Sequence, residues 1–166
     1  ASGVTLTLYH GRSGNIIIPD TIRGKPVTKI GASTFAGKLT SFSTLKLPAS
    51  LQEIGAKAFV DCPGLSGNVL VPPSVRTIGQ QAFFCLEPGN GITSVEFLGD
   101  APSLGSDAFI GCASGFCVRY RSGSTGFATP DWEGFRREVS ARVFEEWEYT
   151  DDGTSVTIVG YQGRGG

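Results

Sequence analysis

The stretch AFVDCPGLSGNVLVPPSVRTIGQQAF, residues 58–83, begins and ends on the same two letters, Ala and Phe. It belongs to a longer pattern of the form apolar-Gly-x-x-x-Phe. That pattern occurs as IGASTF, IGAKAF, IGQQAF and LGSDAF, which end at Phe35, Phe59, Phe83 and Phe109, with spacings of 24, 24 and 26 residues. A near-constant spacing of this length is typical of stacked structural repeats.

A short aliphatic run precedes each of these motifs and is typical of a β-strand. IIIP ends at Pro19, LKLP at Pro48 and VLVPP at Pro73, while SVEFLG spans 94–99. Proline closes three of the four runs because it has no backbone N–H to donate to a strand ladder. Each unit is therefore expected to be a strand, a turn and a loop that carries a Phe.

One such unit cannot bury its own apolar face, but a stack of units can. Stacking would align Ile18, Leu47, Val71 and Phe97 in one row and the four motif Phe residues in another. We therefore predict a mainly β solenoid of about four to five short, irregular coils. The Gly of each motif is expected to take a backbone conformation closed to other residues, at a corner of the coil.

The last quarter of the chain has a different pattern. FEEWEYTDDGTSVTIVGY, residues 144–161, predicts a hairpin with strands at 144–150 and 155–161 around an Asp-Asp-Gly turn. A helix over 131–147 is the alternative to the hairpin, because Trp132, Phe135, Val139 and Val143 fall at helical spacing. A short helix over 131–139 before the hairpin would reconcile the two patterns. The expected organisation is a single repeat domain, 1–166, with an N-terminal strand in 1–14, repeat coils in 15–117, a closing segment in 118–142 and the C-terminal hairpin in 143–166.

The segments LKLPASLQEIGAKAFVDCPGL and VLVPPSVRTIGQQAF resemble the BspA-like leucine-rich repeats of bacterial proteins. FLGDAPSLGSDAF is similar to a variant last coil of that family, and VRYRSGSTGF to the segment that closes it. The chain departs from the pattern at Cys85, which follows its Phe by two residues where Cys62 and Cys112 follow by three. The resemblance implies surface-exposed or secreted bacterial proteins, often adhesins, and it carries no catalytic residue.

The cysteines allow two interpretations. Cys62, Cys85 and Cys112 can be small buried hydrophobic residues of the turn after each Phe. Alternatively, Cys112 and Cys117 could form a disulfide if the chain lies outside the cell. No C-x-x-C motif and only one histidine, His10, occur in the sequence, so we predict no metal and no cofactor. Nucleophile-elbow and phosphate-loop motifs are also missing, and we predict no enzymatic activity.

Charge limits the kinds of partner. The net charge of −1 argues against nucleic acid, and no apolar run of 18 residues occurs, which argues against membrane insertion. The two ends differ in sign: residues 1–60 hold seven Lys or Arg against two acids, a balance of +5, and residues 143–166 hold five acids against one Arg, a balance of −4.

The two ends also resemble each other in sequence. GVTLTLYHGRSG at 3–14 matches TSVTIVGYQGRGG at 154–166, with Val4 on Val156, Leu6 on Ile158 and Tyr9 on Tyr161, at a constant offset of 152. Either the chain is one module of a longer protein with a superrepeat of about that length, or separate copies stack head to tail. A self-capped monomer is a third alternative. Stacking is physically coherent because an open strand edge accepts another chain.

We therefore predict an extracellular or bacterial cell-surface protein that assembles head to tail with copies of itself into a fibre or array. The alternative is an adhesin or protein-binding module that holds a host or surface protein. Exposed aromatic residues should distinguish the two, since assembly needs them at the ends and a partner surface needs them elsewhere. The expected assembly residues are Val4, Leu6, Leu8, Tyr9, Trp147, Tyr149, Val156, Ile158 and Tyr161.

Overall fold

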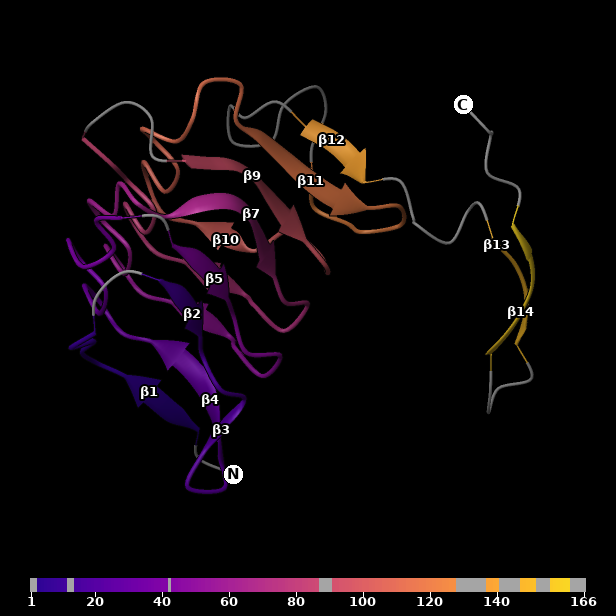
Figure 1. Cartoon of the computed structure of the whole chain (residues 1–166), viewed down its shortest axis with the longest axis horizontal. Helices are drawn as coiled ribbons and strands as arrows, with labels where there is room; N and C mark the ends of the chain where they lie inside the picture. The colour runs from indigo at the N-terminus through magenta and orange to yellow at the C-terminus, as the bar shows by residue number, and fades with distance from the viewer. Residues whose placement is uncertain are drawn as a thin grey trace.

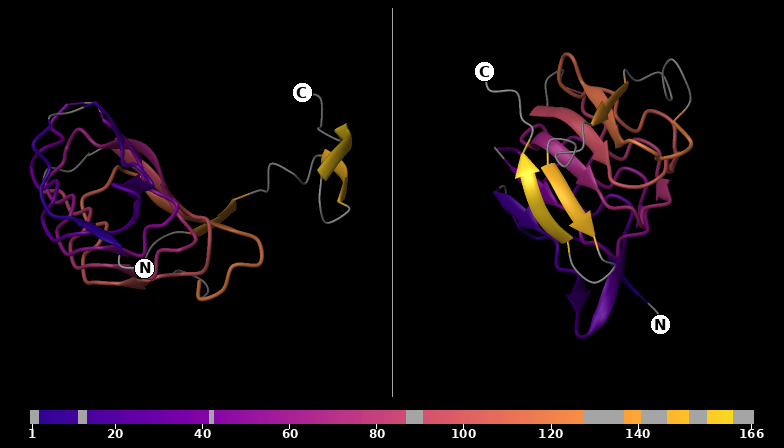
Figure 2. Two further views of the ribbon diagram at one scale, coloured as in Figure 1. Left: turned by 90° about the horizontal axis from the view of Figure 1, so that it is seen from below. Right: turned by 90° about the vertical axis from the view of Figure 1, so that its right-hand side faces the viewer.

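The structure is a computed structural model, and it describes residues 3–11, 14–41, 43–86, 91–127, 137–140, 147–151 and 156–161. The last three ranges are described as backbone strands. Over the first four ranges the chain winds as a parallel β-solenoid of about four turns (Figure 1). The left view of Figure 2 looks along the stack and shows the coils wound around one interior.

One face of the solenoid is a sheet of short parallel strands in the order β1-β4-β6-β8-β10. Their bounds are Val4–Leu6 for β1, Lys25–Ile30 for β4, Glu53–Ile54 for β6, Thr77–Ile78 for β8 and Ser103–Leu104 for β10. The short β3, Thr21–Ile22, pairs antiparallel with the start of β4. The buried Ile30, Ile54 and Ile78 are paired in register across this face and form one aliphatic row.

The second face carries the strands that the proline-ended runs predict. These strands form two sheets. In the first, β2, Asn15–Ile17, pairs with β5, Thr44–Lys46. The second has the order β7, Ser66–Val71; β9, Gly91–Phe97; β11, Cys117–Arg121; and β12, Arg137–Ser140. An isolated parallel bridge from Ser43 to Leu65 lies between β5 and β7. The predicted row of Ile18, Leu47, Val71 and Phe97 is confirmed, because all four are at most 6% exposed.

The third side consists of the turns that hold the motif Phe residues. The rings of Phe35, Phe59, Phe83 and Phe109 are stacked in order, with centroid separations of 4.8, 5.0 and 5.3 Å and interplanar angles of 6–11°. Each ring is at most 2% exposed. The second predicted row is therefore confirmed, and it forms an aromatic ladder along the axis of the solenoid.

The expectation for the motif glycines is wrong. Gly31, Gly55, Gly79 and Gly105 do not have the positive φ that would close the position to other residues. A Cβ at Gly55 would lie 2.8 Å from the backbone nitrogen of Ala32, and one at Gly79 would lie 2.5 Å from that of Ala56. Glycine is needed because the backbones of adjacent coils approach too closely for a side chain.

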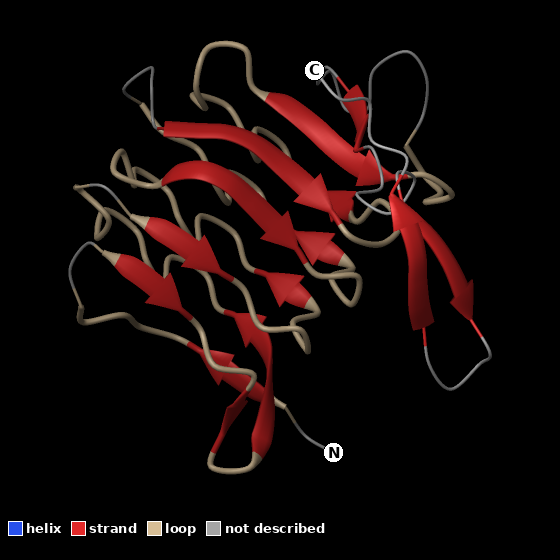
Figure 3. Ribbon diagram, turned by 45° about the vertical axis from the view of Figure 1, so that its right-hand side comes forward, coloured by secondary structure: helices blue, strands red, loops and turns tan. Residues whose placement is uncertain are grey.

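The predicted helix over 131–139 is also wrong where the structure describes it. Arg137–Ser140 is the strand β12, which pairs in parallel with β11, with Val139 opposite Tyr120; residues 131–136 lie outside the described ranges. Pairing in the sheet overrides the helical spacing of the apolar residues. A β-branched residue such as Val139 favours the strand conformation. Figure 3 shows strands and loops with no helix in the described part of the chain.

Candidate assembly interface

The N-terminal segment forms the first half of a coil and ends one sheet of the solenoid. β1 pairs in parallel with β4, with Val4 opposite Val27, Thr5 opposite Lys29 and Leu6 opposite Ile30, and the register is interrupted between Val4 and Thr5. The N–H of Gly31 donates to the carbonyl of Leu6 at 2.7 Å, as the N–H of Gly55 donates to that of Ile30 in the next coil. β1 is the last strand of the described sheet, so its outer edge faces the end of the stack.

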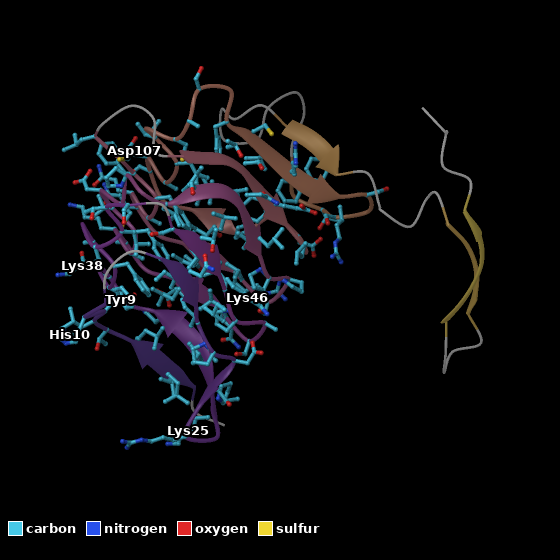
Figure 4. The ribbon with its side chains drawn as sticks, viewed as in Figure 1. Tyr9, His10, Lys25, Lys38, Lys46 and Asp107 are labelled. Carbon is cyan, nitrogen blue, oxygen red and sulfur yellow. The ribbon has the colours of Figure 1, made fainter. Side chains whose placement is uncertain are left out.

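Tyr9 occupies the first place of the aromatic ladder. Its N–H donates to the carbonyl of Thr34 at 3.0 Å, as the N–H of Phe35 donates to that of Ala58. Its ring lies 4.8 Å from that of Phe35 but is tilted by 35°, where the following pairs are within 11° of parallel. Figure 4 shows Tyr9 on the edge of the stack that also carries Lys38 and Asp107.

Most of the predicted interface residues of this end pack against the core of their own chain. Val4, Leu6 and Tyr9 are half-buried and pack against the core, while Leu8 is 60% exposed. A partner strand could therefore reach the backbone edge of β1 and Leu8, but it could reach the other three side chains only if β1 moved away.

Aromatic residues also cover both rows at the other end of the coils. The ring of Phe116 lies 5.5 Å from that of Phe109, and Phe127 lies 4.4 Å from Tyr120 and 5.5 Å from Phe97. All three covering residues, Phe116, Tyr120 and Phe127, are half-buried. The segment that resembles the family's closing segment, 118–127, therefore caps the row that ends at Phe97, and Phe116 just before it caps the row of the motif Phe residues.

Asp100 joins the last coil to this cap. Its Oδ1 accepts a hydrogen bond from the N–H of Thr125 at 2.8 Å, and the N–H of Ala101 donates to the carbonyl of Thr125 at 2.9 Å. The backbone and side chain of Thr125 hydrogen-bond the carboxylate and hold the pKa of Asp100 below its ordinary value, and the nearby charge of Arg76 acts in the same direction. The ionised form of the carboxylate therefore favours this contact between the last coil and the cap.

The C-terminal hairpin is confirmed in the described residues. β13, Trp147–Asp151, pairs antiparallel with β14, Val156–Tyr161, and the two form a separate two-stranded sheet (Figure 1). The register puts Trp147 opposite Tyr161 and Tyr149 opposite Ile158. The hairpin thus brings together the predicted interface residues of the C-terminal end. These residues are related to the predicted interface residues of the N-terminal end by the sequence match between β1 and β14.

None of the four cysteines forms a disulfide in this structure. The Sγ of Cys62 donates to the carbonyl of Phe35 at 3.0 Å, and burial raises the pKa of this thiol. Cys62, Cys85 and Cys117 are buried, and Cys112 is half-buried, as expected for small core residues. The Cys112–Cys117 disulfide is not formed here and stays a prediction for the oxidised protein.

Within the described ranges, no group of three or more His, Cys, Asp or Glu side chains is arranged to hold a metal ion. Helices that could cross a membrane were not found there either.

One surface was not anticipated from the sequence. On the outer side of the second face, Ile17 is 68% exposed and Leu70 is 47% exposed, and both hold the middle place of a proline-ended aliphatic run. Lys46 holds the equivalent place on β5, in register with Ile17. The sequence contained one signal for this surface. Side chains alternate between the two sides of a strand, so every second residue of such a run points outward.

The fold defines a solenoid repeat protein whose coils share one aromatic ladder. The family model described as the BspA type leucine rich repeat region matches residues 12–122 in six copies, which is 111 of the 166 residues. The chain therefore belongs to the BspA-type leucine-rich repeat family, whose repeats typically serve as structural or binding modules of bacterial surface proteins. Searches of curated proteins and of solved structures found no match.

Proposed function

We propose that this protein is a non-enzymatic extracellular or cell-surface subunit that assembles head to tail with copies of itself into a fibre or array. The observation that carries the proposal is the relation between the ends. β1 is the edge strand of a parallel sheet, and β14 matches it in sequence at an offset of 152 residues, with isoleucine in place of leucine at the third position. A chain that presents an open strand edge and carries a second copy of that edge strand has the parts needed for open-ended stacking.

The location of the aromatic residues supports this proposal over a side-on partner. The exposed large hydrophobic residues in the described ranges are aliphatic: Leu8, Ile17, Leu70, Leu86 and Ile110. Half-buried rings lie at both ends of the coils, with Tyr9 at one end and Phe116, Tyr120 and Phe127 at the other. Between the ends, Phe84 of the third coil is half-buried as well. Aromatic residues at the ends are what stacking requires.

Charge supports the same direction of assembly. The chain has a balance of +5 over residues 1–60 and −4 over residues 143–166, so the C-terminal end of one copy attracts the N-terminal end of the next. Such complementarity adds more to the rate and the orientation of encounter than to affinity.

Negative-stain microscopy of the purified chain at low salt tests the proposal. We expect filaments with a subunit rise on the order of 30 Å, because four coils and two hairpin strands at about 4.8 Å each give roughly that spacing. Sedimentation at several protein concentrations provides the matched measurement in solution. A monodisperse monomer at every concentration would contradict the proposal.

The outer side of the second face supports an alternative function as an adhesin or protein-binding module. Ile17 and Leu70 expose aliphatic side chains there. Lys46, which Figure 4 labels, lies on β5 between their strands. If this face holds a host or surface protein, the double variant Ile17→Asp, Leu70→Asp should abolish adhesion of protein-coated beads to cells. The same variant should leave the filaments unchanged, whereas a loss of filaments without loss of adhesion would contradict the alternative.

A further inference from the structure

We infer that assembly proceeds by strand exchange, in which β14 of one copy takes the place of β1 on β4 of the next copy. This inference rests on the proposed head-to-tail assembly and specifies its contact. The occupant of the site is the C-terminal hairpin of a second copy, delivered with β13 already paired to β14. The alternative contact, in which a strand adds to the outer edge of an undisturbed β1, makes different predictions.

β14 fits the place of β1 residue by residue. The pairs of β1 with β4 are Val4 with Val27, Thr5 with Lys29 and Leu6 with Ile30. At the offset of 152, β14 carries Val156, Thr157 and Ile158 at the same three places. Exchange would therefore place Thr157 opposite the neighbour's Lys29 and keep a small apolar residue in each inward position.

The aromatic ladder continues through the same replacement. Tyr9 follows Leu6 by three residues and stacks on Phe35 at 4.8 Å, and Tyr161 follows Ile158 by three residues. When β14 replaces β1, Tyr161 reaches the position in which Tyr9 begins the ladder. The chain thus carries the first ring of the ladder twice, once for its own coils and once for those of a neighbour.

β1 is held from one side only, because it is the last strand of the described sheet. Its register on β4 is interrupted after the first pair, and the ring of Tyr9 is tilted by 35° on Phe35. A strand with one neighbour has fewer contacts to break than a strand with two, so it opens at a lower free-energy cost. β1 therefore leaves β4 more easily than any strand between two neighbours of the sheet.

Exchange also improves the end of the sheet. β14 spans six residues against the three of β1, and it arrives with β13 on its other side. The incoming hairpin replaces the contacts of β1 with those of the same residue types and covers the edge that β1 leaves open. Exchange of equivalent elements between copies is a low-cost route to association, and addition of a strand to an open sheet is an established mode of recognition.

The half-buried side chains of the N-terminal segment favour exchange over edge addition. Val4, Leu6 and Tyr9 face the core of their own chain, so a strand added outside β1 would meet mainly backbone and Leu8. Exchange, in contrast, buries the apolar residues of β14 in the positions that these three vacate. Of the two contacts, only exchange uses the match between β1 and β14 residue by residue.

The experiment uses disulfide formation in full-length variants with two introduced cysteines. In Lys29→Cys, Thr157→Cys, exchange places the two thiols opposite each other in neighbouring copies, and we expect a ladder of covalent oligomers under mild oxidation. In Thr5→Cys, Thr157→Cys, only pairing of β14 with an undisturbed β1 brings the thiols together. Lys46→Cys, Thr157→Cys is the control, because the exposed Lys46 lies on the other face. The parent chain reports any background from the four native thiols.

A ladder in the first variant at least about tenfold stronger than in the other two supports exchange. A ladder confined to the Thr5→Cys, Thr157→Cys variant, or no ladder in any variant whose filaments still form, overturns it. Wild-type protein that stays monomeric contradicts the proposed function itself, so the two failures are distinguishable.

A variant in which a disulfide locks β1 onto β4 provides a second test of strand exchange. Thr5→Cys, Lys29→Cys joins β1 to β4 within one chain, since the two residues are register partners. The reduced protein should assemble like the wild type, and the oxidised protein should lose at least about 90% of its filaments and regain them with reductant. Full assembly of the oxidised protein would overturn strand exchange, because β1 could not then have left its place.

Discussion

At the scale of the residue, Gly79 shows how closely the coils are stacked. A Cβ at this position would lie 2.5 Å from the backbone nitrogen of Ala56, and backbone cannot rotate away as the end of a side chain can. We expect Gly79→Ala to lower the free energy of unfolding by about 3 kcal/mol, the upper part of the range for overpacking a core. Urea unfolding followed by circular dichroism measures the loss.

The matched control for Gly79 is its exposed neighbour Gln80, whose change to Ala should alter the free energy of unfolding by less than about 0.5 kcal/mol. An equal loss in the two variants would show that close approach of the coils is not the reason for glycine at position 79.

Asp100 provides a prediction for pH at the same scale. Its pKa is lowered in the folded state by Thr125, so its contribution to stability is present above the unfolded-state pKa and is lost as the pH falls through the folded value. We expect the unfolding midpoint of the wild type to fall in acid below about pH 4, and that of Asp100→Asn to fall less steeply. Thr125→Val keeps the backbone donor, so an intermediate slope is expected.

Urea midpoints measured at several pH values for the three proteins test this prediction. Identical acid slopes in the wild type and Asp100→Asn would exclude Asp100 as a source of the pH dependence.

At the scale of the element, β1 and β14 compete for the same place on β4. Tyr9 is half-buried on Phe35, and an aromatic pair contributes about 0.5–1.5 kcal/mol beyond its buried area. Tyr9→Ala should therefore free β1 about tenfold more often, which corresponds to about 1.4 kcal/mol. Under strand exchange this variant assembles faster than the wild type.

The reciprocal variant, Tyr161→Ala, removes the ring from the incoming strand and should slow assembly by a similar factor. Tyr9→Phe keeps the ring and serves as the control. Light scattering at matched protein concentrations follows the assembly rate. If Tyr9→Ala slowed assembly as much as Tyr161→Ala, both residues would belong to one interface and β1 would stay in place.

At the scale of the whole molecule, the opposite charges of the ends predict a dependence on salt. Ionic strength of about 1 M shortens the screening length to about 3 Å, from about 10 Å at 0.1 M. The assembly rate should fall about tenfold over this range, because the attraction between the +5 and −4 ends mainly accelerates encounter. The unfolding midpoint of the coils is the control, and it should change little. A rate that rises with salt would indicate that apolar burial alone governs encounter.

The repeat period predicted the coils because its physical basis is local. Phe35, Phe59, Phe83 and Phe109 recur at nearly constant spacing, and any stack of equal units places such residues above one another. The prolines after β2, β5 and β7 predicted the strand ends, since the missing N–H limits a strand wherever it lies. These features need no knowledge of which coil is the neighbour.

Other features required knowledge of the neighbours. Glycine at position 79 could satisfy either an unusual φ or a close approach, and only the distance to the coil of Ala56 distinguishes the two. Val139 has helical spacing in the sequence, but pairing of β12 with β11 decides its conformation. The departure of Cys85 from the repeat pattern also required the structure. Residue 85 lacks the positive φ that is found at the equivalent places, which are Gly37, Asp61 and Gly111.

The sequence by itself determined the coil, its two buried rows and the likeness between the ends, because each depends on residue type and spacing along one chain. Only the tertiary structure decided how the N-terminal end is used. It shows Val4, Leu6 and Tyr9 packed on the first coil rather than presented to a partner, with β1 as a short edge strand. Burial and strand order are properties of contacts between distant segments, and the spacing of residues along the chain does not contain them.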